Sequence, residues 1–211
     1  PISGKRPDLF SRLYEFDPAL VRQKLADYFG IAYTPPTIPD LSDLPEIPQR
    51  PPTLCAGCSH RATFYAVKKA TEGMDVIHPS DIGCYTLGAL PPYNAINSCV
   101  DMGASVTMAK GASDAGLRPA VAVIGDSTFT HSGMTGLLDA INDNSPITVM
   151  ILDNATTAMT GGQDSSAFGK IEEICIGLGV DKEHIHVLDP SPKHHEENMK
   201  IMSQEIQFEG V

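Results

Sequence analysis

The protein has 211 residues, a formal net charge of −11 and an ordinary hydrophobic content of 42%, enough to bury a core in one domain with or without an extension. The acidic balance argues against nucleic acid as a partner, because phosphate binding needs clustered lysine and arginine side chains. No run of eighteen or more apolar residues occurs, so we expect no membrane-spanning segment. Five cysteines, including Cys55 and Cys58 as a CxxC pair, indicate a reducing compartment, and we expect the cytoplasm.

The N-terminal stretch predicts one helix followed by a linker. Over residues 17–30, Asp17 is a suitable N-cap, Pro18 fits the first turn and Gly30 follows the end. Seven prolines then lie between residues 35 and 52. Because proline fixes φ and removes backbone donors, this stretch is expected to be an extended linker.

The composition changes near residue 53, where we place a domain boundary. Residues 1–53 are expected to form the N-terminal helix and proline-rich linker, and residues 54–211 the folded domain. The chain starts at Pro1 without a methionine and closes on an apolar run at residues 206–211. These ends lead us to expect a fragment of a larger polypeptide.

From residue 54 on, helical and strand patterns alternate. Helices are expected at 60–71, 102–116, 132–144, 170–179 and 192–206, and strands at 74–80, 119–126, 146–154 and 184–189. The strands centred on 120–124 and 147–152 are apolar runs, which is typical of parallel strands covered on both faces. The pattern predicts an α/β fold with a parallel sheet and helices on both faces.

Polar residues follow two of these strands at the point where each strand ends. Gly125, Asp126 and Ser127 close one strand, and Asp153 and Asn154 close the next. Asp126 and Asn154 are 28 residues apart, one βαβ unit. Ligands of open α/β sheets bind beyond the carboxyl ends of the strands. A carboxylate and an amide oxygen there can share Mg²⁺, while hydroxyl groups of Ser127 and Thr128 can donate to phosphate oxygens.

A simpler interpretation of the same residues stays open. Asp or Asn after a buried strand is often only a helix cap or a turn former. This interpretation suits either motif alone. The two motifs together, at βαβ spacing, favour a shared cation site.

Several stretches together resemble the thiamine diphosphate-binding domain of the 2-oxoacid:ferredoxin oxidoreductases, and most closely the indolepyruvate:ferredoxin oxidoreductase alpha subunit. They are CAGCSH at 55–60, DIGCYTLGALPP at 81–92, MGASVTMAKG at 102–111, GDSTFTHSG at 125–133 and LDNATTAMTGGQ at 152–163. The resemblance covers about residues 54–211 and implies the thiamine diphosphate-binding fold, in its PP-type domain. The usual Gly-Asp-Gly of the family is Gly-Asp-Ser here, which leaves the expected ligand set intact.

The resemblance implies roles for individual residues. Mg²⁺ would be bound by the side chains of Asp126 and Asn154 and by the backbone carbonyl of Thr156. The residues expected to contact thiamine diphosphate, some through the metal, are Cys55, Gly57, Cys58, Gly83, Cys84, Asp101, Met102, Gly103, Gly125, Asp126, Ser127, Thr128, Asn154, Thr156, Met159 and Thr160.

The cysteines allow three interpretations. In pyruvate-type relatives, similarly placed cysteines bind a [4Fe–4S] cluster, so Cys55, Cys58 and Cys84 could supply three ligands. A cluster of this type takes four thiolates, and neither Cys99 nor Cys175 stands where a fourth is expected. Zinc would need a second CxxC or a histidine pair at suitable spacing. We favour a tight cysteine–glycine loop that packs against the cofactor, with Cys84 as a small apolar contact.

No residue is assigned a catalytic role with certainty. His60 either faces a substrate pocket or is a surface histidine at a helix start. His131 follows the Gly-Asp-Ser loop and is a candidate contact for substrate or phosphate. Tyr85 and Tyr93 are candidates for an aromatic wall.

The resemblance implies oxidative decarboxylation of a 2-oxoacid, with indolepyruvate or another aryl pyruvate as the expected substrate, to an acyl-CoA with ferredoxin as the electron acceptor. A pyrimidine-binding domain or second subunit would complete the site, so we expect an oligomer and an inactive isolated chain. Two alternatives remain. One is another thiamine diphosphate enzyme, a decarboxylase or synthase; the other is a non-catalytic module that binds a phospholigand through Mg²⁺.

Overall fold

The computed structural model describes residues 9–11, 13, 15–37, 39–40, 42, 45–46 and 48–211. The expected start of the N-terminal segment, residues 1–8, lies outside the described residues. Contacts divide the chain into two units, Pro1–Arg50 and Pro51–Val211, and each is described by itself. Among the described residues, no helix combines the length and the apolar character that a transmembrane span requires.

The first unit contains the helix α1, Pro18–Phe29. The carboxylate of Asp17 accepts a hydrogen bond of 2.8 Å from the Leu20 amide, and Gly30 ends the helix at φ 65°. The predicted N-cap, first-turn proline and C-terminal glycine are therefore confirmed. The described residues between 31 and 50 form neither helix nor strand.

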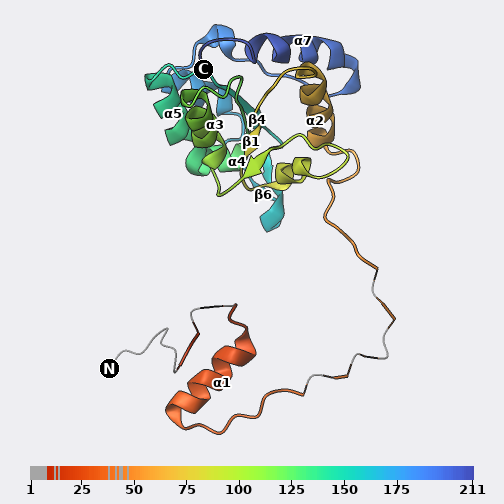
Figure 1. Ribbon diagram of the computed structural model, residues 1–211, viewed down its shortest axis with the longest axis vertical. Coiled ribbons are helices and arrows are strands. Elements are labelled where there is room, and N and C mark those ends of the chain that lie inside the picture. Colours follow the sequence, from red (N-terminus) through yellow and green to blue (C-terminus); the bar gives the residue numbers. More distant parts are fainter. Residues whose placement is uncertain are drawn as a thin grey trace. The chain divides into compact units, whose positions relative to one another are not determined.

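The second unit is built on a parallel sheet in the order β2-β1-β3-β4 (Figure 1). Its strands are β1 (Pro79–Ser80), β2 (Ser98–Cys99), β3 (Val121–Gly125) and β4 (Thr148–Leu152). The α-helices are α2 (Ser59–Ala70), α3 (Ala104–Asp114), α4 (Asp126–Thr128), α5 (Met134–Asn142), α6 (Ile171–Leu178) and α7 (His195–Glu205). An antiparallel pair, β5 (Thr156–Thr157) and β6 (Gln163–Asp164), forms a separate hairpin.

Short helical turns connect these elements. They are the 3₁₀ turns η1 (Cys84–Ala89), η3 (Ala158–Thr160), η4 (Lys182–His184) and η5 (Pro192–His194), and the π-helical turn η2 (Phe129–Gly133). The helix expected at 132–144 thus begins earlier, because α4, η2 and α5 follow one another from residue 126.

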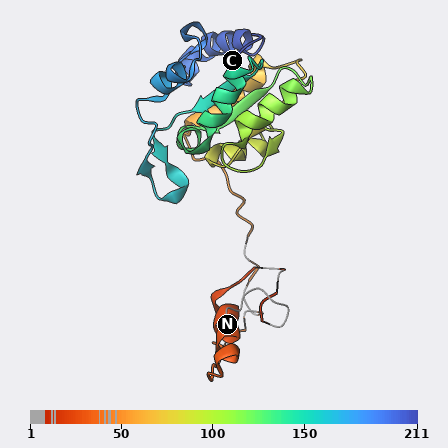
Figure 2. The same cartoon turned by 90° about the vertical axis from the view of Figure 1, so that its left-hand side faces the viewer.

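Strand β3 is buried on both faces, and its alternate side chains enter two separate cores. Val121 and Val123 pack in a core with α2, whereas Ala122 and Ile124 pack in a core with α3, α5 and α6. Helices α3 and α5 lie side by side on one face of the sheet, and α2 lies on the other (Figures 1 and 2). The predicted α/β fold with helices on both faces is confirmed.

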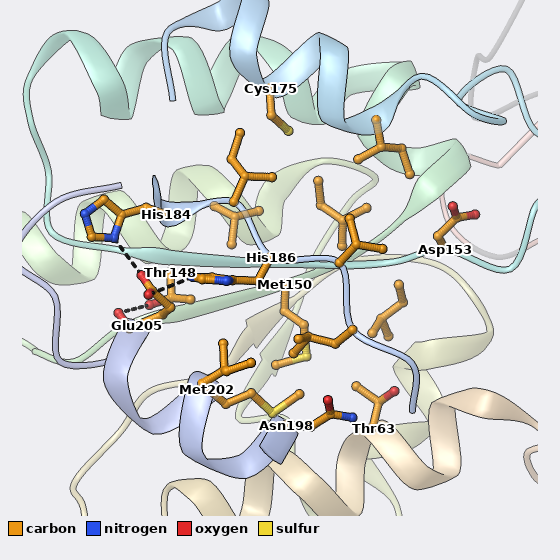
Figure 3. Close-up of a pocket in the computed structure, with 18 of the residues that line it drawn as sticks. Thr63, Thr148, Met150, Asp153, Cys175, His184, His186, Asn198, Met202 and Glu205 are labelled. Atoms are coloured by element: carbon orange, nitrogen blue, oxygen red, sulfur yellow. Dashed lines mark hydrogen bonds and ion pairs between the residues drawn. The ribbon is translucent and has the colours of Figure 1, made fainter. Parts of the chain in front are cut away.

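The prediction of a strand at 184–189 is wrong. Residues 185–190 form no ladder, although they lie near β4. A cavity of about 330 Å³ is lined by all of β4 and by residues 184–188, so the two backbones do not pair (Figure 3). His184 and His186 turn instead to the carboxylate of Glu205, at 2.8 and 2.9 Å. The alternation of polar and apolar residues in this segment therefore reflects the contacts of the two histidines with Glu205 and not a position in the sheet.

Candidate functional site

Asp126 lies at the carboxyl end of β3, where the strand passes directly into α4. The residue is 3% exposed, and its Oδ1 accepts a 2.7 Å hydrogen bond from the Ser127 amide. Its Oδ2 is buried and has no hydrogen-bond partner. Burial raises the pKa of Asp126, the Ser127 amide and the Ser165 hydroxyl oppose this effect, and the nearby carboxylate of Asp153 adds to it. A buried carboxylate oxygen without a partner is costly, and a bound cation would offset that cost.

The hydroxyl groups of Ser127 and Thr128, next to Asp126, bond to neighbouring segments and so fix the start of α4. Ser127 Oγ lies 2.8 Å from Thr157 Oγ1 and 3.1 Å from Ser165 Oγ, which ties the start of α4 to the β5–β6 hairpin. Thr128 Oγ1 donates to the backbone carbonyl of Ile82 at 3.1 Å. The Thr128 hydroxyl therefore points into the fold, and a contact from Thr128 to a phosphate would have to come from its amide.

Two consecutive side chains at the end of β4 shape the next loop. Asp153 Oδ1 accepts from the Ala155 amide at 2.9 Å, and Asn154 Oδ1 accepts from the Thr156 amide at 3.1 Å. Ala155 takes φ 60°, so the chain reverses sharply there. Asp153 was absent from the predicted ligand set although it shares the same strand end as Asn154. Its influence on the pKa of Asp126 places it at the site.

The donor groups at this edge of the sheet suit a hard divalent cation. Asp126 and Asp153 offer carboxylate oxygens, Asn154 an amide oxygen and Thr156 a backbone carbonyl, all of the kind that Mg²⁺ prefers. Within the described residues, no group of three or more His, Cys, Asp or Glu side chains could hold a metal. A cation here would therefore depend on this mixed set together with oxygens of a phosphate ligand and water.

The β5–β6 hairpin carries the remaining predicted cofactor contacts and projects from the body of the domain (Figure 1). Met159 is 67% exposed at its tip. Thr160 and Gln163 bond to each other twice, through Oγ1 to Oε1 at 2.6 Å and Nε2 to the carbonyl at 2.8 Å. Gly161 takes φ 118°, which favours glycine. The loop is thus shaped in advance, and its closure over a diphosphate stays a prediction.

Two further predicted segments, at residues 83–84 and 101–103, are joined through Asp81. Gly83 and Cys84 begin η1 after β1, and Gly103 caps α3 at φ 89°. The fully buried carboxylate of Asp81 joins them, because its Oδ2 accepts a 3.1 Å hydrogen bond from the Gly103 amide. Residues 101–102 are exposed next to this turn.

Cys55, Cys58 and Cys84 are free thiols, and within the described residues they do not form a group of three side chains that could hold a metal. Burial raises the pKa of Cys84, and the neighbouring thiols of Cys58 and Cys55 add to this. Cys99 donates to the backbone carbonyl that follows β1, at 3.4 Å, and Cys175 is buried in the core under α6. Among the described residues, no fourth thiolate therefore joins these three to complete a [4Fe–4S] set.

The cysteine loop brings a histidine to the site. Gly57 takes φ 73° in this loop, and α2 starts just beyond it. His60 is 3% exposed, so the interpretation as a surface histidine is wrong. Burial lowers the pKa of His60, while the carboxylate of Asp126 opposes this effect. His131 is exposed and places its Nδ1 2.9 Å from Ser132 Oγ.

The two tyrosines considered for an aromatic wall have other roles. Tyr85 is 3% exposed, and its hydroxyl donates to the carboxylate of Asp81, so it does not form an open pocket wall. The Tyr93 hydroxyl accepts a 2.7 Å hydrogen bond from Arg61 Nε. The role of Asp81 was missed, since a single Asp before a loop carries no local signal of burial.

Comparisons with known proteins point to one kind of domain. Residues 81–179 match the family described as "Thiamine pyrophosphate enzyme, C-terminal TPP binding domain". The indolepyruvate oxidoreductase subunit IorA of Methanothermobacter marburgensis is 44% identical over 77% of this chain and 26% of its own length. The IorA of Pyrococcus abyssi is 35% identical over the whole chain and 36% of its own length. The chain thus spans about a quarter to a third of these relatives.

Solved structures of similar fold extend this comparison. A 2-oxoglutarate:ferredoxin oxidoreductase from Magnetococcus marinus matches with a TM-score of 0.59 at 17% identity, over 77% of this chain and 62% of that chain. Benzoylformate decarboxylase from Polynucleobacter necessarius matches with a TM-score of 0.55 at 15% identity, over 84% of this chain and 34% of that chain. At such low identity the likeness establishes the fold alone.

Proposed function

Since residues 81–179 match the C-terminal TPP binding domain of thiamine pyrophosphate enzymes and the chain is similar to IorA subunits of indolepyruvate oxidoreductases, we propose that it is the cofactor-binding domain of a 2-oxoacid:ferredoxin oxidoreductase. Residues 54–211 would form the domain, and residues 1–53 would connect it to the rest of a larger polypeptide. The protein would act in the cytoplasm on an aryl pyruvate such as indolepyruvate. CoA would accept the acyl group and ferredoxin the electrons.

The observation that carries this proposal is the buried Oδ2 of Asp126, which has no hydrogen-bond partner. It lies near the carboxylate of Asp153 and at the same sheet edge as Asn154. We take Mg²⁺ to be the group that it contacts when thiamine diphosphate is bound. The ligands from this chain would be Asp126, Asn154 and the carbonyl of Thr156.

Bound thiamine diphosphate would supply a carbon nucleophile and an electron sink for decarboxylation. The residues of this chain would bind and orient it. The diphosphate would lie against the backbone at residues 125–128, and the Thr128 amide, near the start of α4, would donate to its oxygens, since the Ser127 amide already donates to Asp126 Oδ1. The exposed Met159 would cover the diphosphate and exclude water.

The other predicted contacts would surround the cofactor rings. Gly83 and Cys84 would approach them from one loop, and residues 101–103 from the start of α3. The loop at residues 55–58 would pack beside them without a cluster of its own. A pyrimidine-binding domain or second subunit would supply the carboxylate that activates the cofactor, so the isolated chain would be inactive and an oligomer would form the complete site.

Calorimetric titration tests this function. We expect thiamine diphosphate to bind the purified chain only with Mg²⁺. ATP with Mg²⁺ should bind at least tenfold more weakly, a difference of about 1.4 kcal/mol in binding free energy. Asp126→Asn should lose the Mg²⁺-dependent binding. Asp139→Asn, an exposed aspartate on α5, is the matched control and should bind like the wild type. Equal binding of ATP would instead support a general Mg²⁺-phospholigand module.

A further inference from the structure

Asp81 is a fully buried carboxylate that lies directly after β1, outside the set of predicted metal and cofactor ligands. Its Oδ2 accepts hydrogen bonds from the Gly103 amide at 3.1 Å, from the Ser105 amide at 3.4 Å and from Ser105 Oγ at 2.6 Å. Gly103 is the N-cap residue of α3, but it has no side chain that could accept a hydrogen bond from the first turn. Asp81 therefore caps α3 from another segment, where a negative charge is favourable.

The second oxygen of Asp81 is used by Tyr85. The Tyr85 hydroxyl donates to Asp81 Oδ1 and lies 3.1 Å from the carbonyl of Ile82. The Tyr85 ring packs against the backbone of two glycines, one just before η1 and one at the end of β3. A Cβ atom placed on Gly83 would overlap Tyr85 Cε1, and one placed on Gly125 would lie 2.5 Å from the same atom.

These contacts connect the three segments that we propose to surround the cofactor. Asp81 reaches the turn at Gly103, and Tyr85 belongs to η1 together with Cys84. The Tyr85 ring reaches Gly125, the residue before the proposed metal ligand Asp126. Every carboxylate oxygen of Asp81 has a donor, so the pair is satisfied within the fold and needs no ligand of its own.

We propose that Asp81 and Tyr85 form a buried positioning pair that fixes the α3 turn, the η1 loop and the Gly125–Asp126 strand end in the geometry that binds thiamine diphosphate and Mg²⁺. The inference rests on the function proposed above and adds two residues to it. Neither residue touches the cofactor in this account. Each acts through the backbone that it holds, at Gly103 for Asp81 and at Gly125 for Tyr85.

Two variants break the pair in different ways. Tyr85→Phe keeps the ring against Gly125 and removes only the hydroxyl. Asp81→Asn keeps the shape of the side chain but replaces one acceptor oxygen with an NH2 group, which would face a hydrogen-bond donor. Tyr93→Phe is the matched control, because it removes a hydroxyl that bonds to Arg61 away from the pair. The dissociation constant for thiamine diphosphate with Mg²⁺ is measured well below each melting temperature, where every variant is folded, together with amide hydrogen exchange of the ligand-free protein.

We expect Tyr85→Phe and Asp81→Asn each to weaken thiamine diphosphate binding by about tenfold, as for loss of a hydrogen bond to a charged group. The double variant should bind no more weakly than the weaker single variant, because both changes break one unit. Exchange should quicken at residues 103–105 and 125–128. A purely structural role would lower the melting temperature but leave the dissociation constant of the folded variants unchanged.

The outcomes separate this inference from the function on which it rests. If the wild type binds thiamine diphosphate and the dissociation constants of both variants lie within about twofold of its value, the positioning pair is overturned and the proposed function stands. If the wild type does not bind thiamine diphosphate, the proposed function fails. Hydrogen exchange then decides the pair: unchanged exchange at residues 125–128 in both variants overturns it, and faster exchange there supports it.

Discussion

The ring of Tyr85 lies directly against the backbone of Gly125, so closely that a Cβ atom on Gly125 would lie 2.5 Å from Tyr85 Cε1. Gly125 ends β3 in ordinary extended geometry, with φ −83°. The glycine is therefore required by the close approach of the tyrosine ring and not by its own backbone angles. The strand end that carries Asp126 is packed as tightly as a core position.

Gly125→Ala should destabilise the protein by about 1–3 kcal/mol, since an added methyl group has no space beside the Tyr85 ring. Gly111→Ala is the matched control. Gly111 lies inside α3, and no atom lies within 4 Å of the position that an added methyl group would take, so alanine should stabilise the helix by about 0.5–1 kcal/mol. Urea denaturation of both variants measures the difference, and equal effects would contradict this account of the packing.

Asp126→Asn should stabilise the protein in the absence of Mg²⁺ at neutral pH. Burial raises the pKa of the Asp126 carboxyl, so its ionised form contributes unfavourably to folding, and the stability that it provides at low pH is lost as pH rises through the raised pKa. The neutral amide avoids that loss. A gain of about 1 kcal/mol would raise the melting temperature by about 2–4 °C. A lower melting temperature in Mg²⁺-free buffer would count against this explanation.

The affinity for thiamine diphosphate with Mg²⁺ should increase with pH over a range above the usual aspartate pKa of about 3.9. The carboxylate of Asp126 must lose its proton to bind the cation, and its pKa is raised in the folded protein. Titrations at a series of pH values measure this dependence. Asp139→Asn should show the same profile as the wild type, and a flat wild-type profile from about pH 4.5 to 7 would exclude Asp126 as the group.

Glu205→Gln should lower the free energy of unfolding by about 1–2 kcal/mol at pH 7. Burial acts against ionisation, but hydrogen bonds from His184 and His186 prevail and lower the pKa of Glu205. The ionised Glu205 side chain therefore stabilises the folded protein at pH values above its pKa in the unfolded chain. This stabilisation is lost as pH falls through the lowered pKa of the folded protein. The difference between the melting curves of wild type and variant should therefore shrink as pH falls below the usual glutamate pKa of about 4.3; a constant difference across that range would refute the linkage.

The regular elements were predictable because local chemistry specifies them. Asp17 and Gly30 mark both ends of α1, and the unbroken apolar run of β3 indicated a strand covered on both faces. The segment at 184–189 has equally good alternation but no ladder partner, because it lies across a cavity from β4. A strand needs a neighbour, and sequence pattern alone does not supply one.

The site was predictable to the extent that its residues follow strand ends. Asp126 and Asn154 were proposed as metal ligands from that position, which stays a prediction, and Asp153 could have been added to the ligand set by the same rule. Asp81 and Tyr85 could not, because their importance comes from contacts with Gly103 and Gly125, far away in the sequence. Long-range packing of this kind has no local periodicity.

A crystal structure of the protein with thiamine diphosphate and Mg²⁺ tests the central claim most directly. We expect one cation bonded to Asp126 Oδ2 and to the amide oxygen of Asn154, each at about 2.0–2.1 Å, with diphosphate oxygens completing the shell. A diphosphate bound elsewhere, or a cation that contacts only one of these two side chains, would contradict the account.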